Sequence, residues 1–135
     1  MCILAKFAIF FVVLIFGLAG VATAAPTPHK GEATWYNPSD GIGACGRSNG
    51  TQKDSELVGA IAARRYDQMT PDGNPNHSKA CGKKATVKRG SKSVTVTIVD
   101  RCQACGYNDI DLSPTAFKRL AALSEGRVAA SWSGL

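Results

Sequence analysis

A dense apolar run near the amino terminus divides the chain into a part that must fold and a part that need not. The run covers residues 7–22 (FAIFFVVLIFGLAGVA), follows Lys6 and leads into the small-residue motif ATA at 22–24. A short positive region, an apolar stretch and an A-x-A motif in this order are typical of a secretory signal peptide. A membrane-spanning helix would need about 20 apolar residues, and no basic stop-transfer cluster follows this run. We therefore predict a signal peptide at residues 1–24 and a secreted, extracellular protein with no membrane partner after cleavage.

Secretion decides how the cysteines are interpreted. Cys2 would leave with the signal peptide, and the four that remain are Cys45, Cys81, Cys102 and Cys105. An even number of cysteines in a small secreted chain indicates two disulfides, with three possible pairings. A zinc site is disfavoured because one C-x-x-C stands without a second Cys or His pair. A thioredoxin-like redox motif would need a βαβ context, which the sequence lacks. We expect two disulfides, no metal and no cofactor.

About 110 residues remain, which is the size of one domain. We expect a flexible lead-in at 25–30 and a domain at 31–135. Loss of Lys6 leaves 15 Lys and Arg against 10 Asp and Glu, a net charge of +5. This composition excludes a multidomain enzyme, a coiled coil and a wholly disordered chain.

The strongest structural signal is a β-hairpin. Residues 85–89 and 93–99 are rich in β-branched side chains and flank a Gly-Ser-Lys turn at 90–92. Alternation in the second strand predicts one apolar face and one mostly hydroxyl-bearing face. The apolar face would hold Val94, Val96 and Ile98, and the other Thr95, Thr97 and Val99.

Weaker signals complete a β-rich domain with one clear helix. Residues 32–36 and 127–132 are expected to be strands. Ser113 followed by Pro114 predicts the start of a helix, with serine as the N-cap and proline at the first helical position. Residues 55–66 favour a helix weakly, because apolar residues recur there at helical spacing around a glycine.

Four stretches carry a resemblance by their order and spacing. They are GEATWY at 31–36, GACG at 43–46, VTIVDRC at 96–102 and DIDLSPTAF at 109–117. Together they resemble the double-psi β-barrel proteins: expansin N-terminal domains, rare lipoprotein A, barwin-like proteins and family 45 glycoside hydrolases. The chain is most similar to the small single-domain expansin-like proteins called loosenins. The resemblance implies a mainly β, six-stranded double-psi barrel with one clear short helix. It also implies a strand over most of 58–64 and the disulfides Cys45–Cys81 and Cys102–Cys105.

Two aspartates are candidates for chemistry. Asp100 ends a strong strand and Asp111 follows eleven residues later. A pair of carboxylates suggests acid–base work on a glycosidic bond. Spacing alone favours structural roles instead, in which Asp100 binds turn amides and Asp111 helps to cap a helix. The resemblance reverses this for Asp111, which matches the general acid of the related hydrolases, while Asp100 matches a second groove aspartate of expansins.

The sequence departs from the related enzymes at two positions. Family 45 hydrolases carry a catalytic-base aspartate soon after the first-strand aromatic pair, where this chain has Asn37 after Trp35 and Tyr36. A neutral amide cannot take a proton from water, and an inverting hydrolase needs both an acid and a base. Arg64 stands where rare lipoprotein A enzymes carry a histidine. We therefore predict a non-hydrolytic protein rather than an enzyme.

Residues of the first strand are expected to bind the ligand. Strand alternation places Trp35 and Tyr36 on opposite faces, so one of them at most would lie in the groove. We predict that Thr34, Tyr36 and Asn37 contact sugar, with Trp132 in the core.

These inferences lead to a monomer that binds and loosens cell-wall polysaccharide (cellulose, chitin or pectin) without cleaving it. One alternative is a defence or effector module resembling a protease inhibitor. Another is a glycan-cleaving enzyme of lytic transglycosylase or endoglucanase type. Nucleic acid is not expected as a partner, because no binding module for it is recognisable. The hairpin cations would form a solvated face or attract acidic polymers. They are Lys83, Lys84, Lys88, Arg89 and Lys92.

Overall fold

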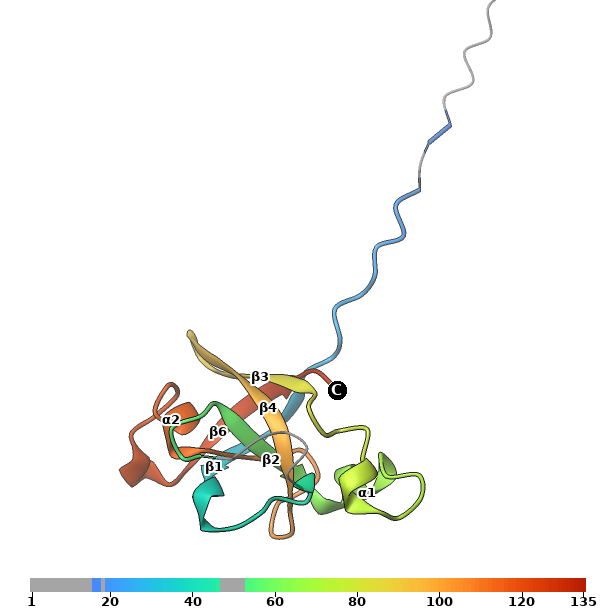
Figure 1. The fold of residues 1–135 in the computed structure, drawn as a ribbon. Coiled ribbons are helices and arrows are strands. Elements are labelled where there is room, and N and C mark those ends of the chain that lie inside the picture. The colour runs from blue at the N-terminus through green and yellow to red at the C-terminus, as the bar shows by residue number, and fades with distance from the viewer. Residues whose placement is uncertain (1–15, 18, 47–52) are drawn as a thin grey trace, which may run out of the picture.

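The computed structural model describes residues 16–17, 19–46 and 53–135. Most of the predicted signal peptide lies outside these residues. The described residues before β1 form no helix or strand and lead away from the barrel (Figure 1). Within the described part of the chain, no helix is long and apolar enough to cross a membrane.

Six strands close into a barrel in the order β1-β5-β2-β4-β3-β6, which confirms the expected fold class. The pairs β1–β5 and β2–β4 are parallel, and the other four pairs are antiparallel. The strands are β1 (His29–Trp35), β2 (Val58–Ala62), β3 (Lys84–Arg89), β4 (Lys92–Cys102), β5 (Ile110–Leu112) and β6 (Arg127–Ser133).

The first strand begins earlier than the sequence indicated. His29 and Lys30, which were expected in the flexible lead-in, pair with Trp132 and Ser131 of β6. The His29 ring also packs on the Trp132 ring, with their centroids 4.5 Å apart. These cross-strand contacts bring two more residues into the barrel.

Two short helices accompany the barrel. The predicted one is α2 (Pro114–Phe117), and the Oγ of its N-cap Ser113 accepts a hydrogen bond from the Ala116 N–H at 3.3 Å. The other, α1 (Ala63–Gln68), follows β2 directly. The 3-10 turns η1 (Pro38–Asp40), η3 (Pro75–His77) and η4 (Leu123–Glu125) lie in loops of the described chain.

The helical spacing of apolar residues wrongly predicted a helix over β2, whereas the family resemblance correctly implied a strand. All five residues of Val58–Ala62 are buried. The strand lies between β4 and β5, so it shows no alternation of exposed and buried positions. A short, fully buried strand cannot be distinguished from a buried helix by periodicity alone.

The hairpin forms as predicted, except that Lys92 belongs to β4 rather than to the turn. Arg89 pairs with Lys92, which leaves a two-residue loop of Gly90 and Ser91. Gly90 has φ +57°, a conformation that favours glycine at this position of a tight hairpin. The inward residues of β3 and β4 pack with Trp132 and Phe117 in the core.

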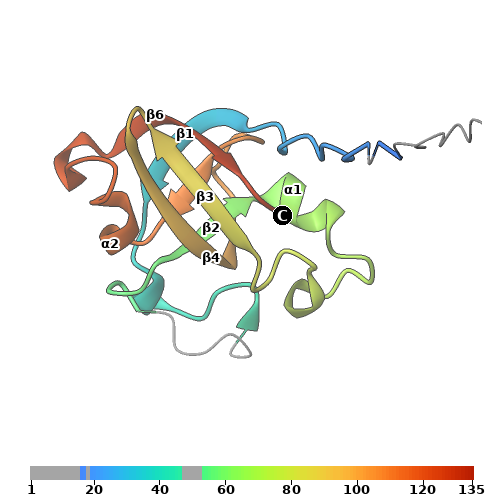
Figure 2. The ribbon, with the colours of Figure 1, turned by 90° about the horizontal axis from the view of Figure 1, so that it is seen from above.

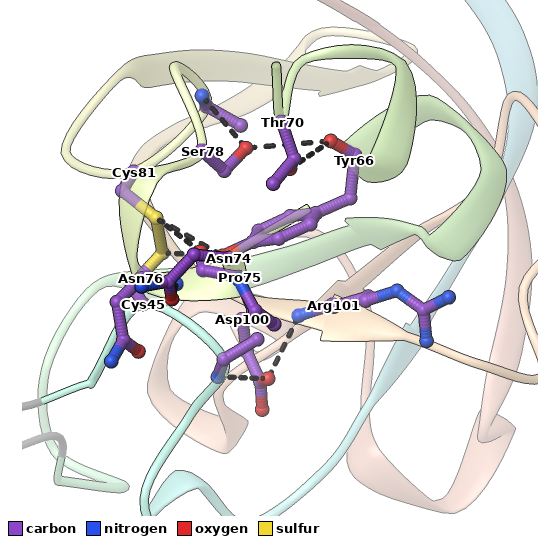
Figure 3. Close-up of a disulfide and its surroundings, with 12 residues drawn as sticks. Cys45, Tyr66, Thr70, Asn74, Pro75, Asn76, Ser78, Cys81, Asp100 and Arg101 are labelled. Carbon is purple, nitrogen blue, oxygen red and sulfur yellow. Dashed lines mark hydrogen bonds between the residues drawn. A yellow bond between two sulfur atoms is a disulfide. The ribbon is translucent and has the colours of Figure 1, made fainter. Parts of the chain in front are cut away.

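Both disulfides pair as the resemblance implied, Cys45 with Cys81 and Cys102 with Cys105. The first lies against the buried Tyr66, whose hydroxyl is 3.1 Å from the Cys81 Sγ and donates to the Pro75 carbonyl (Figure 3). This disulfide joins the loop before β2 to the loop before β3. It therefore restrains two segments that contribute little to the β-ladders.

Candidate functional site

A row of four residues crosses the outer face of the barrel. Thr34 on β1 pairs with Asp111 on β5, Asp111 pairs with Ala60 on β2, and Ala60 pairs with Asp100 on β4. Directly paired residues present their side chains on the same face of a sheet. Ala60 is 2% exposed, so the row reaches the surface through Thr34, Asp111 and Asp100. The backbones of the two aspartates are two strand spacings, about 10 Å, apart.

A β-bulge places Asp100 in this row. Gly59 pairs with Ile98, but the next residue, Ala60, pairs with Asp100, which leaves Val99 as an extra residue in β4. Regular alternation after the buried Ile98 would have pointed Asp100 into the core. The extra residue reverses the alternation and turns the carboxylate outward, as bulges near functional sites often do.

Asp111 is a half-buried acid held by Thr34. The Thr34 hydroxyl donates a hydrogen bond to the Asp111 Oδ1 at 2.8 Å. Burial raises the pKa of Asp111, although the Thr34 hydrogen bond and the positive charge of Arg127 oppose the rise. A carboxyl that keeps its proton to a higher pH can donate as well as accept a hydrogen bond.

Asp100 is held by two backbone amides. Its Oδ1 accepts hydrogen bonds from the N–H groups of Ala44 and Arg101, each at 2.8 Å (Figure 3). The contact with Ala44 ties β4 to the GACG stretch at 43–46. Asp100 therefore has the turn-binding role considered from sequence, and it also lies in the row with Asp111.

Tyr36 directly follows β1 and is partly buried. Its hydroxyl is buried and has no hydrogen-bond partner among the described residues. Burial, followed by the negative charges of Asp100, Asp111 and Asp54, raises the pKa of Tyr36, so the phenol stays neutral. Asn37 is exposed at the start of η1.

Comparison with protein families matches residues 29–132 to the family described as lytic transglycolase, a family of double-psi β-barrels. The chain belongs to this double-psi β-barrel family. Two other findings fit this assignment. A papain inhibitor from Streptomyces mobaraensis is 35% identical over 114 residues, which cover 82% of this chain and 75% of the inhibitor. A solved Streptomyces papain inhibitor has a TM-score of 0.70 at 32% identity, covering 81% of this chain and 94% of that one.

Two longer relatives share the barrel. An allergen homologue from Arthroderma benhamiae is 33% identical over 97 residues, 72% of this chain but 31% of that protein. An expansin from Clavibacter michiganensis has a TM-score of 0.65 at 25% identity, covering 81% of this chain and 50% of the expansin. The chain thus spans about a third of the length of the allergen homologue and about half of the length of the expansin. It is an expansin-like member of the double-psi family.

In this family member the second disulfide lies beside the half-buried acid. The Cys102 Sγ is 3.9 Å from the Asp111 Oδ2, and Cys105 completes a group of three potential metal ligands. Both sulfur atoms are bonded to each other, so neither is available as a thiolate ligand. The disulfide instead forms one wall of the site next to Asp111.

The structure joins some of the predicted aromatic and polar residues to the site and separates others. Trp35 points away from Tyr36, and its indole N–H donates to the Leu123 carbonyl at 3.0 Å. Trp132 is buried, and its indole N–H donates to the Asn108 carbonyl at 2.8 Å, in agreement with its predicted core role. Sequence reasoning missed Ala60 and Arg127, because neither residue type indicates a site without knowledge of strand pairing.

Proposed function

We propose that this protein binds a neutral wall polysaccharide along the Thr34–Asp111–Ala60–Asp100 row and loosens contacts between polysaccharide chains without cleaving them. One observation carries the proposal: a half-buried acid, Asp111, lies in an outward row with the partly exposed Thr34 and Asp100. An expansin barrel with a TM-score of 0.65 to this one was crystallised with cellohexaose, which supports a glucan as the ligand class. Secretion, a monomeric state and polysaccharide binding are parts of this proposal.

Each residue of the row has a separate role in the proposed binding. Asp111 exchanges hydrogen bonds with sugar hydroxyls, and Thr34 holds its carboxyl in place. Ala60 is the buried spacer that sets the separation of the two aspartates, and Asp100 limits the far end of the row. Tyr36 and the exposed Asn37 follow Thr34 in the chain, and the Asn37 amide can donate to or accept from a sugar hydroxyl. Repeated exchange of these hydrogen bonds would compete with bonds between polysaccharide chains.

We attribute the absence of cleavage to Asn37, which stands where family 45 hydrolases carry their catalytic base. An inverting mechanism needs a second carboxylate that activates water across the scissile bond. Asp100 uses its Oδ1 to hold the Ala44 and Arg101 amides, and we assign it to ligand and loop positioning. Asn37 cannot serve because its amide does not accept a proton near neutral pH.

The test compares wild-type protein with Asp111→Asn on cellulose and chitin. Binding, swelling and released reducing sugar are measured in parallel. We expect binding and swelling without sustained sugar release, and a loss of both in Asp111→Asn. Asp72→Asn, at an exposed aspartate in the loop after α1, is the matched control and should behave like wild type. Sustained sugar release that disappears in Asp111→Asn would refute the non-hydrolytic proposal.

A second candidate, a protease inhibitor, is favoured by the 35% identity to the papain inhibitor. It predicts stoichiometric inhibition of a papain-like protease that is unchanged in Asp111→Ala, because the groove acid would have no part in it. Inhibition of this kind, together with no binding to cellulose or chitin, would replace the first proposal. No inhibition at a tenfold excess of this protein over the protease would exclude the second.

A further inference from the structure

Positive charge is concentrated in one segment of the chain. Between Asp72 and Asp100 there is no acidic residue. The same segment carries six cationic residues: Lys79, Lys83, Lys84, Lys88, Arg89 and Lys92. It forms β3, most of β4 and the loop that leads into β3. The barrel is therefore electrostatically unequal around its circumference.

The outward side chains of β3 alternate between lysine and hydroxyl. Lys84 pairs with Thr97, Thr86 with Thr95, and Lys88 with Ser93 on β4. The intervening residues Ala85 and Val87 are fully buried, which shows that the lysines and threonine face outward.

The pattern continues across β6 onto β1. Thr86 also pairs with Ser133, and Lys88 with Ser131, which in turn pairs with Lys30 of β1. We call the outward residues of β3 and their paired partners on β4, β6 and β1 the lysine–hydroxyl face. Strand spacing puts Lys88 and Lys30 about 10 Å apart, and Lys84 lies about 13 Å from Lys88 along β3.

The lysines of this face carry unneutralised charge. All five ion pairs between described residues use arginine or His77, and none uses a lysine. Lys84 Nζ donates only to a hydroxyl, that of Thr97. Arg89, which the sequence placed in the same cluster, is instead paired with Glu125 at 3.1 Å. The arginines thus pair with acidic residues of the protein itself, whereas the lysines of this face can meet an external anion.

The lysine–hydroxyl face and the row that contains Asp111 lie on different halves of the barrel. The row with Asp111 crosses β4-β2-β5-β1, and the lysine–hydroxyl face crosses β4-β3-β6-β1. Only the two boundary strands are shared, and β3 lies between β4 and β6 (Figure 2). A ligand on one face therefore leaves the other accessible.

We propose that the lysine–hydroxyl face is a second binding surface, for an acidic polysaccharide of the polyuronate type. Lysine ammonium groups suit carboxylates, and the threonine and serine hydroxyls suit sugar hydroxyls. Large exposed hydrophobic side chains are absent from this face within the described residues. It therefore offers neither a stacking platform for bases nor an apolar surface for a membrane. This surface goes beyond the groove function, because it would recognise a charged polymer independently of Asp111.

The experiment measures the affinity of the full protein for oligogalacturonate and, separately, for cellohexaose by calorimetry. Lys84→Gln/Lys88→Gln should weaken oligogalacturonate binding about tenfold at low salt and leave cellohexaose binding unchanged. Rising salt should weaken oligogalacturonate binding in the wild-type protein. The charge-matched control Lys53→Gln/Lys118→Gln removes two lysines from other elements and should match wild type.

Three results would overturn the proposal. They are equal weakening by the control variant, unchanged oligogalacturonate affinity in Lys84→Gln/Lys88→Gln, and equal affinity for a single-stranded DNA of the same charge. Asp111→Asn serves as a separate arm and should lose only cellohexaose binding. Failure of the groove proposal would thus appear with cellohexaose, and failure of the second surface with oligogalacturonate.

Discussion

Replacing Tyr36 with phenylalanine tests whether its buried hydroxyl opposes folding. This hydroxyl is buried without a partner among the described residues. An unsatisfied buried polar group costs about 1–3 kcal/mol, whereas phenylalanine keeps the ring and its packing. The small void left by the oxygen offsets part of the gain. We therefore expect the free energy of unfolding to rise by about 1 kcal/mol and Tm by about 4 °C.

Urea unfolding followed by tryptophan fluorescence and circular dichroism measures this change. The m-value should stay constant, so that the shift of the midpoint reports stability alone. Tyr107→Phe is the control, because that tyrosine is exposed and its hydroxyl donates to the Gln68 side chain at 2.7 Å. The control should be neutral or slightly destabilising. A loss of 1 kcal/mol or more in Tyr36→Phe would show that its hydroxyl has a stabilising partner and would refute the reasoning.

The same variant distinguishes two roles that Tyr36 could have in ligand binding. A covered hydroxyl cannot touch sugar, so cellohexaose affinity should stay within twofold of wild type. A larger loss of affinity with a stable fold would mean that the hydroxyl is uncovered on binding and contacts the ligand directly.

Of four further predictions, two concern Asp111, one the disulfides and one the close contact of Gly31 with Asn108. Thr34→Val should raise the pKa of Asp111 further, because it removes a hydrogen bond to the charged form; a carboxyl NMR titration showing a lower pKa would contradict this. Because folding raises the pKa of Asp111, ionisation of this carboxyl lowers stability as pH rises above the unfolded-state pKa of about 3.9. Asp111→Asn should therefore stabilise the fold at pH 7 more than at pH 3. Removing Cys45–Cys81, which spans 36 residues, should lower the free energy of unfolding by about 4 kcal/mol, and removing Cys102–Cys105, which spans 3, by about 2 kcal/mol. Equal losses in denaturant unfolding would show that loop length does not decide the effect. Gly31→Ala should lower Tm strongly, because its Cβ would stand 2.3 Å from the Asn108 carbonyl oxygen. An unchanged Tm would mean that the loop between β4 and β5, which contains Asn108, moves aside easily.

Elements with local signals could be predicted from the sequence. The hairpin has alternating β-branched residues and a glycine turn, and α2 has a serine N-cap followed by proline. Strand β2 and helix α1 have no comparable signal. Their boundary lies between Ala62 and Ala63, and only the pairing of β2 with β4 and β5 distinguishes the strand from the helix.

The candidate aspartates could be named from the sequence, but their geometry could not be predicted from it. Asp100 and Asp111 were identified from their motifs, yet regular alternation would have pointed Asp100 into the core. The extra residue Val99 corrects its direction, and nothing in the local sequence marks that bulge. Thr34 reaches Asp111 only because β1 and β5, far apart in the sequence, lie parallel and adjacent. The pairing of distant strands therefore decides which side chains meet.

The same geometry explains how one barrel can support both cleavage and binding. The row with Asp111 lies within hydrogen-bonded ladders on four strands, so its spacing is fixed by the closed sheet. Asn37 lies outside those ladders, in the turn after β1, where a substitution disturbs no strand pairing. Because a hydrolase needs both an acid and a base, exchange of one loop residue can remove the chemistry and leave the binding row intact. We therefore expect differences in activity among such barrels to reside in the loops, and shared ligand binding to reside in the row.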